Sequence, residues 1–118
     1  MQETTSEIKR LTAAAAGVIR SGEAIEAALN RLEEVKSQMA EWRVAGDFNE
    51  LVQCLEVEDM ALSAEIILGA ALRRRESRGA HYRKDFPDTD DETWRKNIIV
   101  KRSEDGSMGF EIREISEQ

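Results

Sequence analysis

Apolar residues recur at intervals of three and four along three successive segments that are separated by very short connections. The positions are Ile8, Leu11, Ala15 and Val18 in residues 6–19; Ile25, Leu29, Leu32, Val35, Met39 and Trp42 in residues 21–44; and Leu51, Leu55, Leu62 and Ile66 in a segment that begins near residue 47. This spacing places apolar side chains on one face of each helix. Helices joined so tightly must run antiparallel, so the sequence predicts an up-down-up three-helix bundle, like a spectrin repeat.

Capping residues predict where these helices begin and end. The signals are a capping box of Thr4 and Glu7 for the first helix, Ser21 and Gly46 for the second, and Asp47 and Gly79 for the third. Four arginines, Arg73, Arg74, Arg75 and Arg78, crowd the predicted end of the third helix. Cations there oppose the negative end of the helix dipole, so we expect a solvated helix end.

After residue 79 the composition changes. The only proline, Pro87, lies in an acidic loop, and Thr89 with Glu92 predicts a one-turn helix around Trp94. Residues 97–102 and 109–115 read as two strands joined by a turn at 103–107. Because isolated hairpins are marginally stable, we expect this one to pack on the bundle. The prediction is a mainly α fold in one domain, with residues 1–79 as the bundle and 80–118 as a charged loop and β-hairpin tail.

Charge and hydropathy exclude several classes of protein. The 118 residues hold 17 Lys and Arg against 24 Asp and Glu, a net charge of −7, which is opposite to a nucleic-acid-binding surface. No run approaches the ~18 apolar residues of a membrane span, so we expect a soluble chain without direct membrane insertion. A single cysteine, Cys54, cannot form an internal disulfide and fits a reducing compartment.

No motif for catalysis or ligand binding is complete in this chain. The glycines form no phosphate-binding pattern, and one histidine with one cysteine cannot build a site of paired soft metal ligands. A nucleophile paired with His81, either Ser77 or Cys54, would lack an oxyanion hole. The acidic run 85–92 lacks the glycine and bidentate glutamate of an EF-hand loop, so helix capping and pairing with arginines explain it better. We therefore expect no catalytic, cofactor-binding or metal-ligating residue here, and the dense charge suggests a docking surface.

Those same residues carry a resemblance to a known family. The run RRRESRGAHYRKDFPDTDDETWRKN, from Arg73 to Asn97, resembles a stretch near the end of the flavoprotein subunits of succinate dehydrogenase and fumarate reductase. That pattern is E-S-R-G-A-H, then R-x-D-F/Y-P, then D-D-x-x-W, and Asn97 stands where the family usually has histidine. The segment AAAAGVIRSGEAIEAALNRLEEV, residues 13–35, is similar to the family's first two bundle helices. The likeness covers nearly the whole chain.

The resemblance implies a role without chemistry for this chain. In these flavoproteins an N-terminal Rossmann-like domain holds FAD and performs the oxidoreductase reaction of electron transport, and the C-terminal bundle supports it. The expected partners are that FAD-binding domain, an iron–sulfur subunit, and, for an isolated fragment, a second copy. Arg78, His81, Arg83 and Trp94 are the predicted interdomain contacts, while Gly79 and Thr89 are expected to be structural. The expected location is cytoplasmic, with the parent peripheral on the inner face of a membrane.

Two alternatives stay open. L-aspartate oxidase shares this domain, but its motif usually reads G-L-H where this chain has Gly79, Ala80 and His81, and its tail commonly lacks a charged hairpin. These differences favour the succinate dehydrogenase and fumarate reductase branch. The second alternative is a stand-alone helical interaction module that self-associates. Whether Met1 is a native start or begins an excised fragment is not decided by the sequence.

Overall fold

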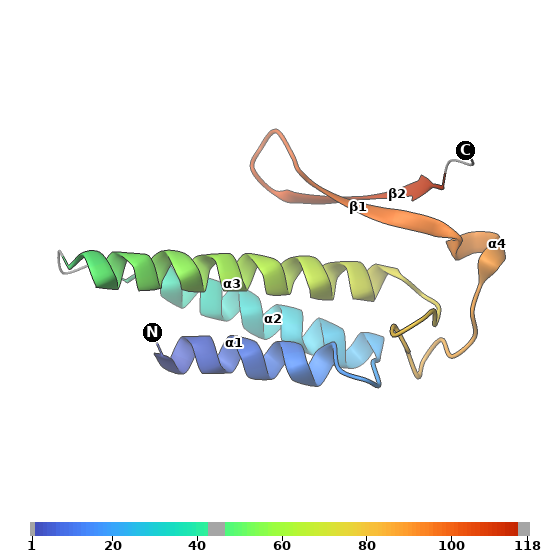
Figure 1. The fold of residues 1–118 in the computed structure, drawn as a ribbon, viewed down its shortest axis with the longest axis horizontal. Coiled ribbons are helices and arrows are strands. Elements are labelled where there is room, and N and C mark those ends of the chain that lie inside the picture. The colour runs from blue at the N-terminus through green and yellow to red at the C-terminus, as the bar shows by residue number, and fades with distance from the viewer. Residues whose placement is uncertain (1, 43–46, 116–118) are drawn as a thin grey trace.

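The computed structural model describes residues 2–42 and 47–115 and consists of three long helices followed by a hairpin (Figure 1). The elements are α1 (Gln2–Ala15), α2 (Gly22–Met39), α3 (Phe48–Arg73), the one-turn α4 (Asp91–Trp94), β1 (Lys96–Arg102) and β2 (Met108–Glu114). The three long helices lie side by side, and the hairpin stands over α3. The predicted mainly α architecture with a C-terminal hairpin is confirmed.

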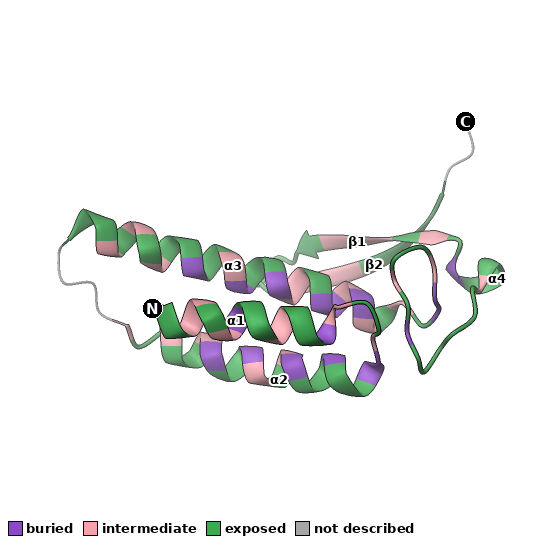
Figure 2. Cartoon of the chain, turned by 60° about the horizontal axis from the view of Figure 1, so that its bottom comes forward, coloured by how far each residue is buried: buried purple, intermediate pink, exposed green. Residues whose placement is uncertain are grey.

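The core combines a few large side chains with many alanines. Ile8 of α1, Ile25 and Leu32 of α2 and Leu68 of α3 are at most 1% exposed. Fully burying a side chain of this size stabilises the fold by about 1.5–3 kcal/mol. The buried alanines are Ala15, Ala28, Ala61, Ala64 and Ala71. Their small side chains let the helix axes approach closely, and Figure 2 shows the buried positions on the facing sides of the helices.

The predicted core face of α3 is wrong. Leu51, Leu55 and Leu62 are 42%, 51% and 50% exposed. The buried residues of this helix are instead Val57, Ala61, Ala64, Leu68, Gly69 and Ala71. The helix therefore carries two apolar faces, and the bundle covers the one with the smaller side chains. Periodicity identifies an apolar stripe, but it does not say which of two stripes a neighbour covers.

Two of the predicted helix starts are correct and two are not. Ser21 caps α2 by accepting a hydrogen bond from the Ala24 amide, and Asp47 caps α3 by accepting from the Asn49 amide. In contrast, α1 begins at Gln2, so Thr4 and Glu7 lie inside the helix and form no capping box. The N-cap of α4 is Asp90, not Thr89: Asp90 accepts from the Thr93 amide at 3.0 Å.

The long helices end earlier than the sequence predicts. Because α1 ends at Ala15, Val18 lies in the connection to α2 and is 86% exposed. The helix α2 ends at Met39, and Trp42 packs partly buried against the core beyond it. The predicted stop at Gly46 lies outside the described residues. The helix α3 ends at Arg73, six positions before the predicted stop at Gly79.

The hairpin lies within one residue of its predicted bounds and rests on α3. Its strands are antiparallel, with Ile98 opposite Ile112 and Val100 opposite Phe110. The Phe110 ring packs directly on Gly69, where an added Cβ would clash with the ring. The Arg73 guanidinium covers that ring at 3.6 Å from its centroid. The absence of a side chain at Gly69 thus allows Phe110 of the hairpin to pack against α3.

Candidate functional site

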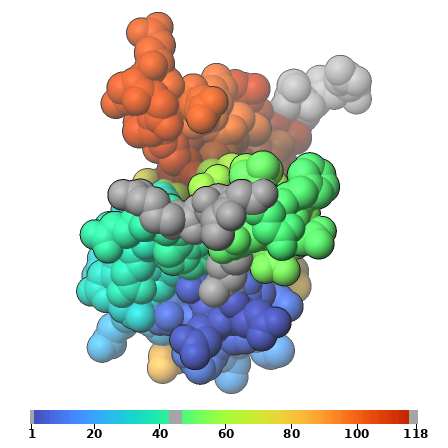
Figure 3. Space-filling view, turned by 90° about the vertical axis from the view of Figure 1, so that its left-hand side faces the viewer, coloured from blue at the N-terminus to red at the C-terminus, as the bar shows by residue number. Residues whose placement is uncertain are grey.

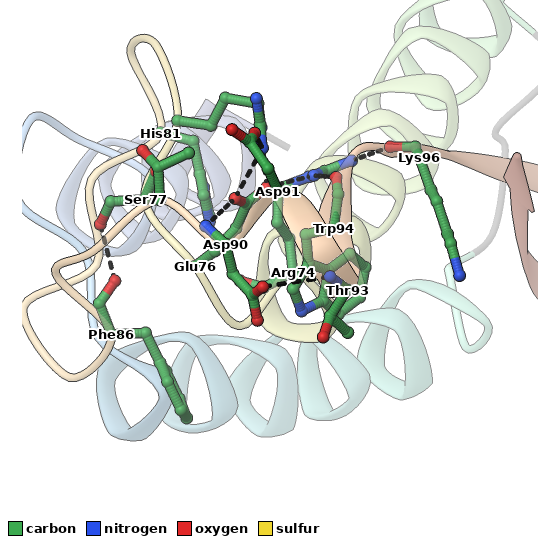
Figure 4. Close-up of polar contacts among 12 residues, drawn as sticks. Arg74, Glu76, Ser77, His81, Phe86, Asp90, Asp91, Thr93, Trp94 and Lys96 are labelled. Atoms are coloured by element: carbon green, nitrogen blue, oxygen red, sulfur yellow. Dashed lines mark hydrogen bonds and ion pairs between the residues drawn. The ribbon is translucent and has the colours of Figure 1, made fainter. Parts of the chain in front are cut away.

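The chain that follows α3 folds back over the end of the bundle and pairs with the α1–α2 connection. The Arg20 amide donates to the Tyr82 carbonyl at 2.8 Å, and the Lys84 amide donates to the Arg20 carbonyl at 2.7 Å. We call the charged cluster that forms there the polar junction. Its members are Arg20, Arg74, Glu76, Ser77, Arg78, His81, Arg83, Asp85 and Asp90, several of which are drawn in Figure 4.

Arg83 is the centre of the junction and is only 2% exposed. Its Nη1 donates to the carbonyls of Leu72 at 2.7 Å and Arg74 at 3.2 Å. These carbonyls lie at the C-terminus of α3, where the last turn leaves acceptors without an intrahelical partner. The guanidinium therefore caps α3 from a position well beyond the helix in sequence, and its charge matches the negative end of the helix dipole.

Asp85 links the same arginine to the opposite end of a second helix. Arg83 holds its carboxylate with two hydrogen bonds, Nε to Oδ1 at 3.1 Å and Nη2 to Oδ2 at 2.7 Å. The Gly22 amide, in the first turn of α2, donates to the same carboxylate at 3.0 Å. The Arg83 hydrogen bond keeps the pKa of Asp85 below its ordinary value, and the Gly22 amide adds to this. One ion pair thus joins the C-terminus of α3 to the N-terminus of α2.

Glu76 is a fully buried carboxylate, 0% exposed. It accepts from Arg74 Nη1 at 2.5 Å, from Arg78 Nε at 3.0 Å and Nη2 at 3.2 Å, and from the Asp90 amide at 2.9 Å. Burial alone would raise the pKa of Glu76, but these hydrogen bonds outweigh it and hold the pKa below its ordinary value. Glu76 therefore stays ionised and ties the end of α3 to the turn before α4.

Arg74 and Ser77 extend this network to the rest of the loop. Arg74 donates to the carbonyls of Trp94 at 3.0 Å and Lys96 at 2.7 Å, and its guanidinium lies 5.2 Å from the Trp94 ring. The Ser77 hydroxyl donates to the Phe86 carbonyl at 2.8 Å and accepts from the Arg83 amide at 3.0 Å. The loop between α3 and β1 is consequently held by these polar contacts together with the buried side chain of Trp94.

His81 lies between two arginines and is neutral. Arg20 can only donate, so His81 Nδ1 must be the acceptor in their 3.0 Å contact. Nε2 then carries the proton and donates to the Arg74 carbonyl at 3.1 Å. Burial lowers the pKa of His81, and the nearby positive charges of Arg20, Arg83 and Arg74 lower it further, while the carbonyl contact acts in the opposite direction.

Acidification between pH 7 and pH 5 is expected to destabilise the chain through His81. An unfolded histidine takes up a proton near pH 6.5, whereas the folded one resists it, so the stabilisation is present above pH 6.5 and is lost as the pH falls toward the folded pKa. The slope can reach about 1.4 kcal/mol per pH unit for one proton. Urea unfolding at several pH values measures it. Because His81 is the only histidine, His81→Gln should flatten the profile in this window, and an unchanged slope would contradict the assignment.

Gly79 occupies the tight turn in which Arg78 and His81 exchange backbone hydrogen bonds of 2.8 and 2.9 Å. Its φ is +58°, and an added Cβ would meet nothing within 4 Å. Gly79→Ala should therefore lower the free energy of unfolding by about 1 kcal/mol, through backbone strain alone. Thermal unfolding measures this loss. The control is Ala80→Gly, which should have a smaller effect because Ala80 has no positive φ; equal losses would contradict the strain argument.

The four predicted interdomain residues fall into two groups. Arg83 and Trp94 are 2% and 7% exposed, and their side chains already contact this chain. Arg78 is partly exposed and pairs with Glu76 and Asp91, and His81 is also partly exposed. The predicted pairing of the acidic run with arginines is present in Asp85–Arg83 and Asp91–Arg78.

Sequence reasoning missed the partners inside the chain. These are Arg20, Arg74, Glu76 and Ser77 of the polar junction, whereas Asp85 belongs to the acidic run whose pairing with arginines was predicted. The available signal was the density of both charges within one short segment, which indicates ion pairs without saying which residues form them. Within residues 2–42 and 47–115, no cluster of three or more His, Cys, Asp or Glu could hold a metal ion. Over the same ranges, no helix is long and apolar enough to cross a membrane.

Comparison with known proteins places this arrangement in a family. Residues 5–118 match the family described as fumarate reductase flavoprotein C-term. The chain is 39% identical over 101 residues to the fumarate reductase flavoprotein subunit of Mycobacterium tuberculosis. It is 38% identical over 88 residues to a chain of the fumarate reductase (CoM/CoB) of Methanothermobacter marburgensis, and 31% identical over 117 residues to L-aspartate oxidase of Streptomyces coelicolor.

These alignments cover 80%, 72% and 98% of this chain but only 17%, 16% and 20% of the relatives, in the same order. The chain therefore spans a fifth or less of the curated relatives it matches. Mycobacterium smegmatis Sdh1 in complex with UQ1 superposes with a TM-score of 0.86 at 27% identity, over 98% of this chain and 20% of that one. A quinol–fumarate reductase with menaquinol molecules shares the fold with a TM-score of 0.89 at 22% identity, over 99% and 21%. This chain belongs to the family of C-terminal domains of fumarate reductase and succinate dehydrogenase flavoproteins.

Proposed function

We propose that this chain acts as the C-terminal helical domain of an FAD-dependent oxidoreductase of the succinate dehydrogenase and fumarate reductase type. In that protein it supports the FAD-binding domain and contributes to subunit docking, while FAD and the reacting groups belong to the rest of the polypeptide. The parent would be a cytoplasmic protein that lies peripherally on the membrane. The observation that carries the docking role is an exposed apolar patch at the end of the bundle, next to a backbone segment fixed by hydrogen bonds.

This patch, which we call the end patch, consists of Val18, Ile19 and Tyr82. Their exposed fractions are 86%, 63% and 41%. Val18 and Ile19 precede Arg20, whose backbone pairs on both sides with residues 82 and 84. The Arg20 side chain also donates to the carbonyls of Ala16 and Gly17, at 3.2 and 3.1 Å. Exposed apolar groups that lie together are typical of protein contacts.

The residues of the family motif divide into those that fix the loop and those that remain available to a partner. Arg83 and Trp94 are engaged within the chain, so their role is to position the loop. Arg78 and His81 are partly exposed, and a polar rim of this kind is typical of an interface around an apolar centre. We therefore propose the end patch as the centre of the interdomain contact, with the partly exposed Arg78 and His81 as its polar neighbours.

L-aspartate oxidase is the second candidate parent, because its alignment covers 98% of this chain. The supporting role would be the same, and only the reaction of the parent would differ. Assaying the intact parent flavoprotein with succinate, fumarate and L-aspartate separates the two. Stoichiometric self-association of the chain, with no binding to an FAD domain, would favour the interaction module instead.

The docking proposal is tested with the double variant Val18→Asp and Ile19→Asp. In the isolated chain, the free energy of unfolding should change by no more than about 0.5 kcal/mol, because both side chains are exposed. In the intact parent the same change should cause loss of flavin or failure of assembly, measured by flavin absorbance after gel filtration. The control is Ile115→Asp, at a side chain that is 51% exposed beyond the hairpin. A parent variant that retains its flavin and assembles normally would reject the end patch as the contact.

A further inference from the structure

We infer that the outer face of α3 binds a separate protein whose surface presents apolar side chains rimmed by lysine or arginine. The outer face consists of Phe48, Leu51, Leu55 and Leu62. It lies along the side of the bundle, whereas the end patch lies at the bundle's end. The inference therefore goes beyond the contact with the FAD-binding domain and does not depend on it.

The outer face is a continuous stripe rather than a set of scattered residues. The four side chains follow a spacing of three, four and seven, which keeps them on one side of a 26-residue helix. Their exposed fractions are 76%, 42%, 51% and 50%. The core residues Val57, Ala61, Ala64 and Leu68 occupy the opposite side. Isolated exposed leucines need no explanation, but an aligned row of them on a helix indicates a binding face.

The hairpin shows what covers this stripe farther along the helix. Figure 3 shows the hairpin standing over α3 on the side away from α1. Between them lies a groove of ≈ 410 Å³, into which the stripe continues at Leu62 and Ile66. On the hairpin side the groove is lined by Val100 and Met108, with Lys101 and Arg102 beside them. The same apolar stripe of α3 is therefore covered by the hairpin at one end and uncovered along the outer face. Where the hairpin covers it, the hairpin presents apolar side chains with basic residues beside them.

The acidic residues on α3 also favour a partner with basic residues around its apolar surface. Glu58 and Asp59 lie between Leu55 and Leu62 in the sequence, and both are exposed. Neither forms an ion pair within residues 2–42 and 47–115. A second copy of this chain, with its own net charge of −7, would bring these carboxylates against each other. Juxtaposed like charges disfavour association, so a basic rim fits this face and a second copy does not.

Two synthetic amphipathic helical peptides test the inference. Both carry the same leucine stripe, one flanked by lysines and the other by glutamates, and each is titrated into the 118-residue chain by calorimetry and by amide chemical shifts. The lysine peptide should bind at least tenfold more tightly and shift amides of residues 48–62. The double variant Leu51→Ser and Leu55→Ser should weaken its binding at least tenfold. The matched control, Ile19→Ser in the end patch, should bind like the unchanged chain.

A second variant keeps the test decisive if the serine variant folds poorly. Charge reversal by Glu58→Lys and Asp59→Lys leaves the leucines in place and should reverse the preference between the two peptides. Equal binding of both peptides, an unreversed preference, or shifts centred on the end patch would overturn the inference. Concentration-dependent dimerisation that the serine variant abolishes would also overturn it, because the face would then belong to a second copy. None of these outcomes affects the FAD-domain proposal, which is tested at Val18 and Ile19.

Discussion

Arg83→Ala is expected to lower the free energy of unfolding of this chain by about 3–5 kcal/mol, the usual loss when one partner of a buried ion pair is removed. The guanidinium is 2% exposed, and its removal takes donors from the carbonyls at the end of α3 and both hydrogen bonds from Asp85. Asp85 is itself 36% exposed, so water can replace part of that loss and the lower end of the range applies. For a chain of this size the melting temperature should fall by about 10 °C or more.

Urea unfolding followed by circular dichroism measures the effect of Arg83→Ala. Arg75→Ala is the matched control, since Arg75 is exposed in the same segment and should change stability by less than about 0.5 kcal/mol. Arg83→Lys should remain clearly destabilised, because a lysine cannot donate to the α3 carbonyls and hold Asp85 with two bonds at once. If Arg83→Ala and Arg75→Ala gave the same small shift, Arg83 would not be the centre of the junction.

Local patterns predict the elements of this fold well because each depends on neighbours in sequence. The N-caps at Ser21 and Asp47 and the turn at Asp105 and Gly106 need only a few adjacent residues. The predicted strands, residues 97–102 and 109–115, lie within one residue of the observed strands at every end. Gly79 shows the limit of such signals: it was predicted to end the third helix, but its positive φ serves a turn in the loop that follows α3.

The error on α3 has a different physical origin. This helix carries leucines on one side and mostly alanines on the other, and the regular spacing of the leucines predicted their side as the core. The bundle instead buries Ala61, Ala64 and Ala71, because small residues permit close helix packing. An apolar stripe can face a bundle, a hairpin or another protein. Sequence periodicity alone cannot choose among them.

The polar junction could not be assigned from the sequence because its bonds depend on the path of the loop. Several arginines lie close together between residues 73 and 83, and in an unfolded chain each of them could reach a neighbouring carboxylate. The fold selects Arg83 for burial because the loop pairs with Arg20 and returns to the end of α3. Charge density predicted ion pairs, and tertiary structure decided which of them are buried.

Glu76 is the second place where a buried charge holds this loop. Its Oε2 accepts from Arg74 and from Arg78 Nε, and its Oε1 accepts from Arg78 Nη2 and the Asp90 amide. Both carboxylate oxygens accept hydrogen bonds. In a glutamine, the NH2 group would replace one of these oxygens, and as a donor it could not accept from the donors that face it. The site therefore requires two acceptor oxygens, and only an ionised carboxylate supplies both.

Glu76→Gln should consequently lower the free energy of unfolding by about 3 kcal/mol, within the range for breaking a buried ion pair. The lowered pKa of Glu76 means that its stabilisation is present above the ordinary glutamate pKa and is lost as the pH falls below it. The difference between wild type and Glu76→Gln should therefore shrink under acid conditions, as urea unfolding at pH 7 and at about pH 3 would measure. Glu92→Gln, at an exposed position in α4, is the matched control and should change stability little at either pH. If Glu76→Gln matched that control at pH 7, the buried carboxylate would not be what fixes the loop to the bundle.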